Sequence, residues 1–341
     1  MPDRLSQKTL SAFSLARHPS YDRSKVKAGI LHIGVGMAKE MGQRLKFNLP
    51  NIVCADLLKL CVEPCCALPF APEQVALSFA GAEAIAPTTA MAATWVTLRP
   101  TPGASVEFRA VATGLGEWAS PGTEETTTYV LGGWVGVIHT ATMANLTAGT
   151  RYEYRVGSLE HGYSPSFNFT TLPLNAGTAE RPLKVLSLAD MGTEHSEHTV
   201  ARMAALVAAG EVDFVIHYGD LGYADGDEPR WDVWARLMQP IAARVAYMTT
   251  PGNHECMGNF TAYRHRYTMP KAGGGWPHDA MYYGFSAGAL SLTMLDSETE
   301  INTANIGVLQ VRFAAEKLRA ANARKQFLVV AQHRPLYTSS R

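Results

Sequence analysis

The sequence predicts an α+β chain of two domains, in which a β-sandwich precedes an α/β domain. Between Pro72 and Pro173, short segments alternate polar and apolar residues with period two, and Pro and Gly turns separate them. Between Val185 and Thr250, apolar runs alternate with segments of helical periodicity, which indicates parallel strands joined by helices. With 341 residues, 47% of them hydrophobic, the chain is long enough for two or three domains with real cores.

The composition excludes several classes of partner. A formal net charge of +0 gives no reason to expect binding to nucleic acid or to an anionic membrane. No apolar run reaches the roughly 18–20 residues that span a bilayer. Residues 1–7 do not form a signal peptide. The cysteines favour buried thiols or one local disulfide over a zinc site, because four crowd one stretch and one stands alone: Cys54, Cys61, Cys65, Cys66 and Cys256.

The sandwich is expected to occupy residues 72–173. Its predicted strands are 75–79, 92–97, 105–109, 152–156 and 167–171. The segment Leu146–Tyr152 resembles the corner before a late strand of a fibronectin-III-like sandwich. Residues 173–181 then form the linker, and residues 1–71 form a leader of uncertain structure.

The α/β domain is expected from residue 182 to residue 341. Its first strands are 185–189, 214–218 and 244–250, and its first helices are 197–209 and 231–243. Right-handed crossovers bring the carboxyl ends of these strands to one edge of the sheet. Further along, the patterns predict a loop over 259–270, a hairpin over 282–285 and 289–295, a helix over 308–321 and a strand over 327–331.

Each of the first three strands ends in an oxygen ligand beside a glycine. Asp190 follows the first strand, Asp220 the second and Asn253 the third. Ligands bind at the carboxyl ends of strands in open α/β sheets. Carboxylate and amide oxygens suit a metal, and His254 beside Asn253 can donate a proton. The sequence therefore predicts a metal site at this edge.

These segments resemble a known family. The motifs Asp190-x-Gly192, Gly219-Asp220-x-x-Tyr223 and Gly252-Asn253-His254-Glu255 are similar to the first three motifs of the calcineurin-like metallophosphoesterases. The tyrosine variant, Tyr223, is that of the purple acid phosphatases. Phe327–Tyr337, an apolar strand that leads to His333, resembles the fourth motif. The resemblance covers about residues 72–341, and its sandwich is like the domain that precedes the catalytic one in the larger purple acid phosphatases.

The resemblance implies an acid phosphatase that hydrolyses phosphate monoesters at a dinuclear metal centre. It pairs Fe(III), the ion that a tyrosine ligand favours, with a second divalent metal, Fe, Zn or Mn. Asp190 and Tyr223 would serve iron, Asn253 and His333 the second metal, and Asp220 both. Asn253 and His254 would contact the substrate phosphate, and His254 would protonate the leaving group.

One part of the family pattern is missing. The fifth motif, Gly-His-x-His, does not occur before the chain ends at Arg341. In the family it supplies one histidine to each metal, so we expect weak metal binding and poor hydrolysis of p-nitrophenyl phosphate by the 341-residue chain. The sheet would also keep an open edge. The alternative function is an inactive or truncated remnant that binds metal or phosphate weakly without turnover.

The first 36 residues show a different resemblance. Tyr21–Ser24 and Gly29–Gly36 are similar to the amino terminus of the mannitol dehydrogenase family, which opens a dinucleotide-binding fold. Gly34-x-Gly36 is followed by Gly42, so the GxGxxG spacing is lost and we expect no dinucleotide site. A third functional hypothesis, an oxidoreductase fragment, rests on these residues alone.

Three N-glycosylation sequons begin at Asn145, Asn168 and Asn259. By family resemblance, the chain belongs in a secreted or lysosomal-type compartment. The expected partners are small phosphate monoesters, and the sequence leaves open whether the protein forms a homodimer.

Overall fold

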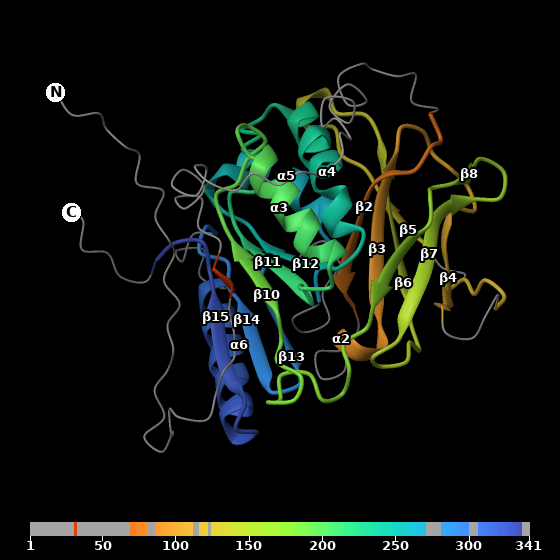
Figure 1. Ribbon diagram of the computed structural model, residues 1–341. Helices are drawn as coiled ribbons and strands as arrows, with labels where there is room; N and C mark the ends of the chain where they lie inside the picture. Colours follow the sequence, from red (N-terminus) through yellow and green to blue (C-terminus); the bar gives the residue numbers. More distant parts are fainter. Residues whose placement is uncertain are drawn as a thin grey trace, which may run out of the picture.

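A computed structural model describes residues 31–32, 69–80, 86–111, 116–121, 124–270, 281–299 and 306–335. Figure 1 shows a β-sandwich on one side and an α/β unit on the other. One sandwich layer contains β2 (Glu73–Phe79), β3 (Met91–Thr97), β6 (Val137–Met143) and β5 (Glu125–Thr127). The other contains β4 (Ser105–Ala110), β7 (Arg151–Ser158), β8 (Gly162–Tyr163) and β9 (Phe167–Thr170). Two short helices, α2 (Ala86–Thr89) and the 3-10 turn η4 (Leu131–Gly133), connect these strands. The predicted order of folds, a β-sandwich followed by an α/β domain, is confirmed.

The α/β unit begins with the expected β-α-β-α-β run. It comprises β10 (Val185–Leu188), α3 (Glu197–Ala208), β11 (Phe214–Tyr218), α4 (Glu228–Ala242) and β12 (Ala246–Thr250). The three strands are parallel and adjacent, so their carboxyl ends share one edge. The helices cover one face of the sheet, where Trp231, Trp234 and Ile241 of α4 pack with Val215 of β11. After β12 come the 3-10 turn η5 (Asn253–Glu255) and α5 (Met257–Arg266).

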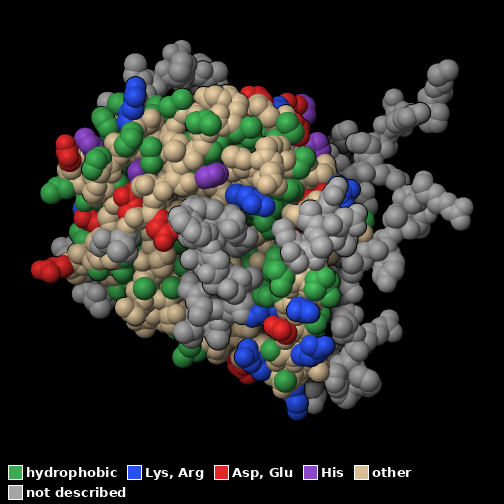
Figure 2. Space-filling model, turned by 180° about the vertical axis from the view of Figure 1, so that it is seen from behind, with side chains coloured by type: hydrophobic (Ala, Val, Ile, Leu, Met, Phe, Trp, Pro, Cys, Tyr) green, Lys and Arg blue, Asp and Glu red, His purple; other side chains and the backbone are tan. Residues whose placement is uncertain are grey.

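A second sheet covers the opposite face. Its strands are β13 (Tyr283–Ala287), β14 (Leu290–Met294) and β15 (Phe327–Ala331), and β15 lies at its edge. Phe285 of this sheet meets Phe214 of β11 edge-on, with ring centroids 5.6 Å apart. The helix α6 (Ile306–Ala323) packs on β14 and β15. Figure 2 shows basic side chains gathered over this end of the molecule, where α6 exposes Arg312 and Arg319.

The sandwich and the α/β unit are joined through a shared sheet. β2 of the sandwich pairs in parallel with β12 at one position, Leu77 with Ala246. One hydrophobic cluster contains both Tyr154 of the sandwich and Ile216 of the parallel sheet. The sheet also gains β1 (Leu31–His32), which pairs with β10 on the other side. Because buried apolar area is continuous across the joint, the two parts stabilise each other.

Several expectations need correction. Residues 259–270 do not form a loop, because α5 continues to Arg266; its first turn contains three residues in the left-handed region, which hid the helical period. Cys256 is exposed and free, not buried. The other four cysteines lie outside the described residues. The glycines of the segment that resembles the mannitol dehydrogenases, Gly29–Gly36, also lie outside them. No helix within the described ranges is long and apolar enough to cross a membrane.

His217 makes the stability of the fold depend on pH. It is fully buried in β11, where its Nδ1 lies 2.8 Å from the Tyr247 hydroxyl. Burial, and secondarily the nearby charge of His333, lowers the pKa of His217 to about 3. The folded state therefore holds a neutral imidazole, whose contribution to stability is present above the unfolded pKa near 6.5 and is lost as the pH falls.

We expect the free energy of unfolding to fall by up to about 4 kcal/mol from this group between pH 6.5 and 3. Urea unfolding at a series of pH values measures this slope. The His217→Gln chain should show a shallower slope, whereas the exposed His198→Gln control should match the parent. Equal slopes for the parent and His217→Gln would contradict the assignment.

Candidate metal centre

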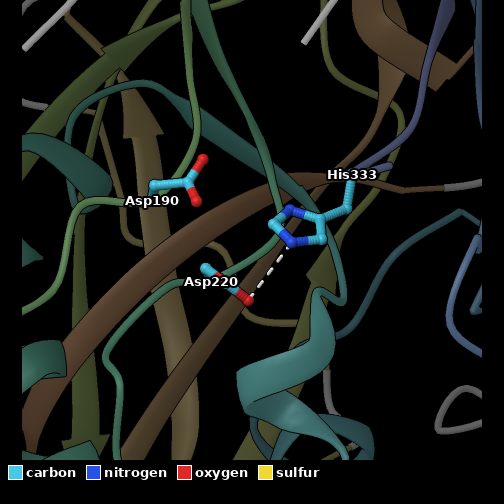
Figure 3. Close-up of side chains that lie close together, drawn as sticks. All are labelled: Asp190, Asp220 and His333. Atoms are coloured by element: carbon cyan, nitrogen blue, oxygen red, sulfur yellow. Dashed lines mark ion pairs between the residues drawn. The ribbon is translucent and has the colours of Figure 1, made fainter. Parts of the chain in front are cut away.

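The candidate site lies at the carboxyl edge of the parallel sheet. Asp190 follows β10, Asp220 follows β11, and Asn253 lies in the turn after β12. His333 comes from the second sheet, two residues beyond the end of β15. The sequence prediction that these strand ends converge is met by the structure (Figure 3).

The distances in the cluster are short. Asp190, Asp220 and His333 each offer one ligand atom, and these atoms lie within 4.8 Å of one another. His333 Nε2 is 3.4 Å from Asp220 Oδ1 and 3.1 Å from Asn253 Oδ1. The Tyr223 hydroxyl donates a hydrogen bond to Asp190 Oδ1 at 3.3 Å. All five side chains predicted as metal ligands therefore meet at one place.

This convergence depends on unusual backbone conformations. Three residues of the cluster have a left-handed backbone, which residues other than glycine rarely adopt. Their φ values are 57° for Asp190, 54° for Asp220 and 50° for Tyr223. A Cβ on Gly252 would lie 2.3 Å from Asp220 Oδ1 and 2.4 Å from its backbone nitrogen. Such strain is commonly stored at functional sites. The glycine in this motif is thus required by the close approach of two loops.

Glu255 holds together the loops that follow β11 and β12. Its side chain is buried, and it accepts hydrogen bonds from the backbone N–H groups of Asp220, Leu221 and Gly252 at 2.8, 3.0 and 2.7 Å. Burial raises the pKa of Glu255 to about 7, and the backbone donors partly offset that effect. These contacts show that Glu255 orients the backbone of the two loops.

His254 lies beside the cluster and is partly exposed. Its ring centroid is 4.4 Å from that of Tyr223, and its backbone N–H donates to Asp220 Oδ1 at 3.0 Å. Its Nδ1 is 2.6 Å from Asp225 Oδ1. Because a carboxylate that accepts from Nδ1 orients the ring, Nε2 is left to act at the site. His254 Nε2 is 3.8 Å from Asp220 Oδ2.

Two contributing residues escaped the sequence analysis. Asp225 was not assigned a role, although it lies two residues after Tyr223. Arg230 Nη1 donates to the Tyr223 carbonyl at 3.0 Å, and its other terminal nitrogen pairs with Glu194. The position of Arg230 at the start of a helix that follows a ligand-bearing loop is the only signal in the sequence for this contact.

The pKa of the Tyr223 phenol is raised well above its ordinary value. Burial is the main cause, followed by the negative charges of Asp190 and Asp220. The donor set contains two carboxylates, a phenol, an amide oxygen and an imidazole. Hard cations prefer oxygen donors, and first-row metals also accept imidazole, so these residues fit a metal centre.

Comparisons with known proteins agree with this geometry. Residues 72–171 match the family model of the purple acid phosphatase N-terminal domain, and residues 183–341 match that of the calcineurin-like phosphoesterases. The chain is 31% identical to human acid phosphatase type 7 over 281 residues, which cover 79% of this chain and 60% of that protein. It is 27% identical to purple acid phosphatase 23 of Arabidopsis thaliana, over 60% of this chain and 50% of that protein.

The fold has a match among solved structures. The purple acid phosphatase PPD1 from yellow lupin (Lupinus luteus) seeds superposes with a TM-score of 0.66 at 22% identity, over 80% of this chain and 52% of that one. The comparisons give no support to the resemblance of residues 1–36 to the mannitol dehydrogenases. The chain spans 60% of the length of the human relative that it matches. Over its sandwich and its α/β domain, the chain belongs to the purple acid phosphatase family within the calcineurin-like metallophosphoesterases.

Proposed function

We propose that the chain acts as an acid phosphatase that hydrolyses phosphate monoesters at a dinuclear metal centre. The observation that carries this proposal is the convergence of ligand atoms from Asp190, Asp220 and His333 within 4.8 Å, with Tyr223 and Asn253 in contact with them. The names of the relatives, acid phosphatase and purple acid phosphatase, support the reaction class.

In this proposal, Asp190, Asp220 and Tyr223 hold Fe(III), while Asp220, Asn253 and His333 hold a divalent Fe, Zn or Mn ion. When bound, such a pair of ions neutralises phosphate charge and supplies hydroxide at acid pH. Asp220 is suited to both ions because a carboxylate can offer one oxygen to each, and its ligand atom lies within 4.8 Å of those of both Asp190 and His333.

The chain's own residues would supply orientation and a proton. The amide of Asn253 lies in contact with His333, where it can bind a phosphate oxygen as well as a metal. Asp225 orients the His254 ring, so that Nε2 carries the proton for the leaving alkoxide. Glu255 holds the backbones of both motifs at their present separation.

Hydrolysis of p-nitrophenyl phosphate tests the proposal. With added iron and zinc, we expect acid hydrolysis that a chelator abolishes. His254→Asn should lower the turnover of phenyl phosphate, whose leaving group needs a proton, by about 100-fold or more while leaving the bound metal per chain unchanged. The exposed His198→Asn variant is the control. Metal binding without any turnover would overturn the phosphatase and support the alternative, a remnant that binds metal or phosphate only.

Secretion and glycosylation belong to the same proposal. Asn145 and Asn259 are exposed, whereas Asn168 in β9 is half-buried. If the protein passes through the secretory pathway, we therefore expect Asn145 and Asn259 to be glycosylated more completely than Asn168.

A further inference from the structure

A turn of the sandwich reaches the helices that follow the Asp225–His254 pair. η4 contacts both α4 and α5. α4 begins at Glu228, three residues after Asp225, and α5 begins at Met257, three residues after His254. The approach is close, because a Cβ on Gly132 of η4 would lie 2.6 Å from Glu228 Cγ. The sandwich thus borders the two helices whose amino-terminal loops carry the pair.

Arg266, the last residue of α5, ties these parts together inside the molecule. Its side chain is buried. Nε donates to the Tyr129 hydroxyl at 2.7 Å, and Nη1 donates to Gln74 Oε1 at 3.1 Å, both in the sandwich. Nη2 donates to Asp232 Oδ1 of α4 at 2.8 Å. The guanidinium lies 4.6 Å from the centre of the Trp134 ring. Breaking such a buried network leaves unpaired polar groups and is costly.

The Tyr129 hydroxyl completes the link. While it accepts from Arg266, it donates to Glu228 Oε2 at 3.0 Å, in the first turn of α4. Glu228 is buried, and the Tyr129 ring stacks on Trp134 with centroids 4.4 Å apart. A single hydroxyl of the sandwich therefore connects the end of α5 to the beginning of α4.

We propose that Tyr129 and Arg266 are positioning residues for the Asp225–His254 pair. Only short segments separate the paired side chains from the anchored helices: residues 226–227 lead from Asp225 to α4, and the left-handed turn at residues 258–260 lies between His254 and the helical part of α5. Fixing the helices against one sandwich surface therefore fixes the contact of 2.6 Å between His254 Nδ1 and Asp225 Oδ1. The catalytic meaning of this contact rests on the proposed function, but its dependence on the sandwich does not.

Tyr129→Phe tests the proposal, since it removes one hydroxyl and keeps the stacked ring. The matched control is Tyr154→Phe. Tyr154 is also a buried sandwich tyrosine, and its hydroxyl donates to the Ala243 carbonyl at 2.8 Å, just beyond the far end of α4. Both variants remove one buried hydroxyl between the same two domains, at opposite ends of α4. Tyr129→Phe loses two hydrogen bonds, with Glu228 and Arg266, and Tyr154→Phe loses one, with Ala243.

Amide hydrogen exchange on the metal-free 341-residue chain is the first measurement. In Tyr129→Phe, amides of residues 224–227 and 253–257 should exchange about tenfold faster, while those of 190–192 should not change. Tyr154→Phe should leave all three segments as in the parent. Unchanged exchange in Tyr129→Phe, or equal acceleration in both variants, would overturn the proposal.

Kinetics give the second measurement. Tyr129→Phe should lower kcat for phenyl phosphate, whose leaving group needs a proton, by about tenfold with KM nearly unchanged, because the misplaced group acts on the leaving group rather than on binding. Tyr154→Phe should retain the parental kcat. A parent chain that binds metal but shows no turnover would defeat the proposed phosphatase, and hydrogen exchange would still decide the positioning role.

Discussion

Replacing Asp220 with Asn is expected to lower the affinity of the chain for Zn²⁺ by at least about 100-fold. Asp220 Oδ1 is 3.4 Å from His333 Nε2, and the carboxylate belongs to the cluster whose ligand atoms lie within 4.8 Å. Asn has nearly the same shape and can still accept the His254 backbone N–H, which now bonds to Oδ1 at 3.0 Å. The substitution therefore removes charge and one oxygen ligand with little change in packing.

Isothermal titration calorimetry with Zn²⁺ measures the loss. Asp213→Asn is the control, because Asp213 lies just before β11, at the opposite end of that strand, and pairs with Arg181. The control should bind Zn²⁺ as the parent does, even if its stability falls. If Asp220→Asn keeps the parental affinity, Asp220 is not a ligand of the principal metal site.

Gly219→Ala is expected to lower the free energy of unfolding by about 3 kcal/mol or more. Gly219 has φ +90°, and an added Cβ would lie 2.5 Å from His333 Nδ1 and 2.7 Å from Gly252 Cα. The backbone of Gly252 cannot move without displacing Asp220, so both the fold and the site should suffer. Urea denaturation measures the stability, and the same Zn²⁺ titration measures the site.

Gly210→Ala separates strain from crowding. Gly210 has φ +71°, but its Cβ would meet nothing within 4 Å. We expect a cost of about 1 kcal/mol from the left-handed conformation alone. If both substitutions destabilise the chain equally, the close approach of the strand ends is not what requires glycine at position 219.

The parallel strands and the cluster at their ends were predictable from sequence. The apolar runs before Asp190, Asp220 and Asn253 have the length and composition of buried strands, and the intervening helices have a clear period. Topology then requires the strand ends to meet. The candidate ligands Asp190, Asp220 and Asn253 followed from a local pattern that is repeated along the chain, whereas Tyr223 and His333 followed from the family resemblance.

Other parts could not be predicted from local pattern. β6 was missed because Ile138, His139 and Thr140 are buried in succession, so no alternation marks it. α5 was missed because Gly258, Asn259 and Phe260 leave the helical conformation. Gln74 and Arg266 are 192 residues apart, and nothing in either sequence neighbourhood indicates their contact. Domain boundaries at residues 72–173 and 182–341 remain predictions.

The joint between β2 and β12 has a consequence for how the chain acquires its structure. A ribosome delivers Glu73–Phe79 long before Ala246–Thr250. The sandwich strands pair within a short stretch of sequence, so their edge can form while the rest is still being synthesised. The unpaired edge of β2 then offers a template onto which β12 docks in parallel, where Leu77 pairs with Ala246. Parallel pairing over such a separation is slow when unassisted, and a preformed template removes part of that delay.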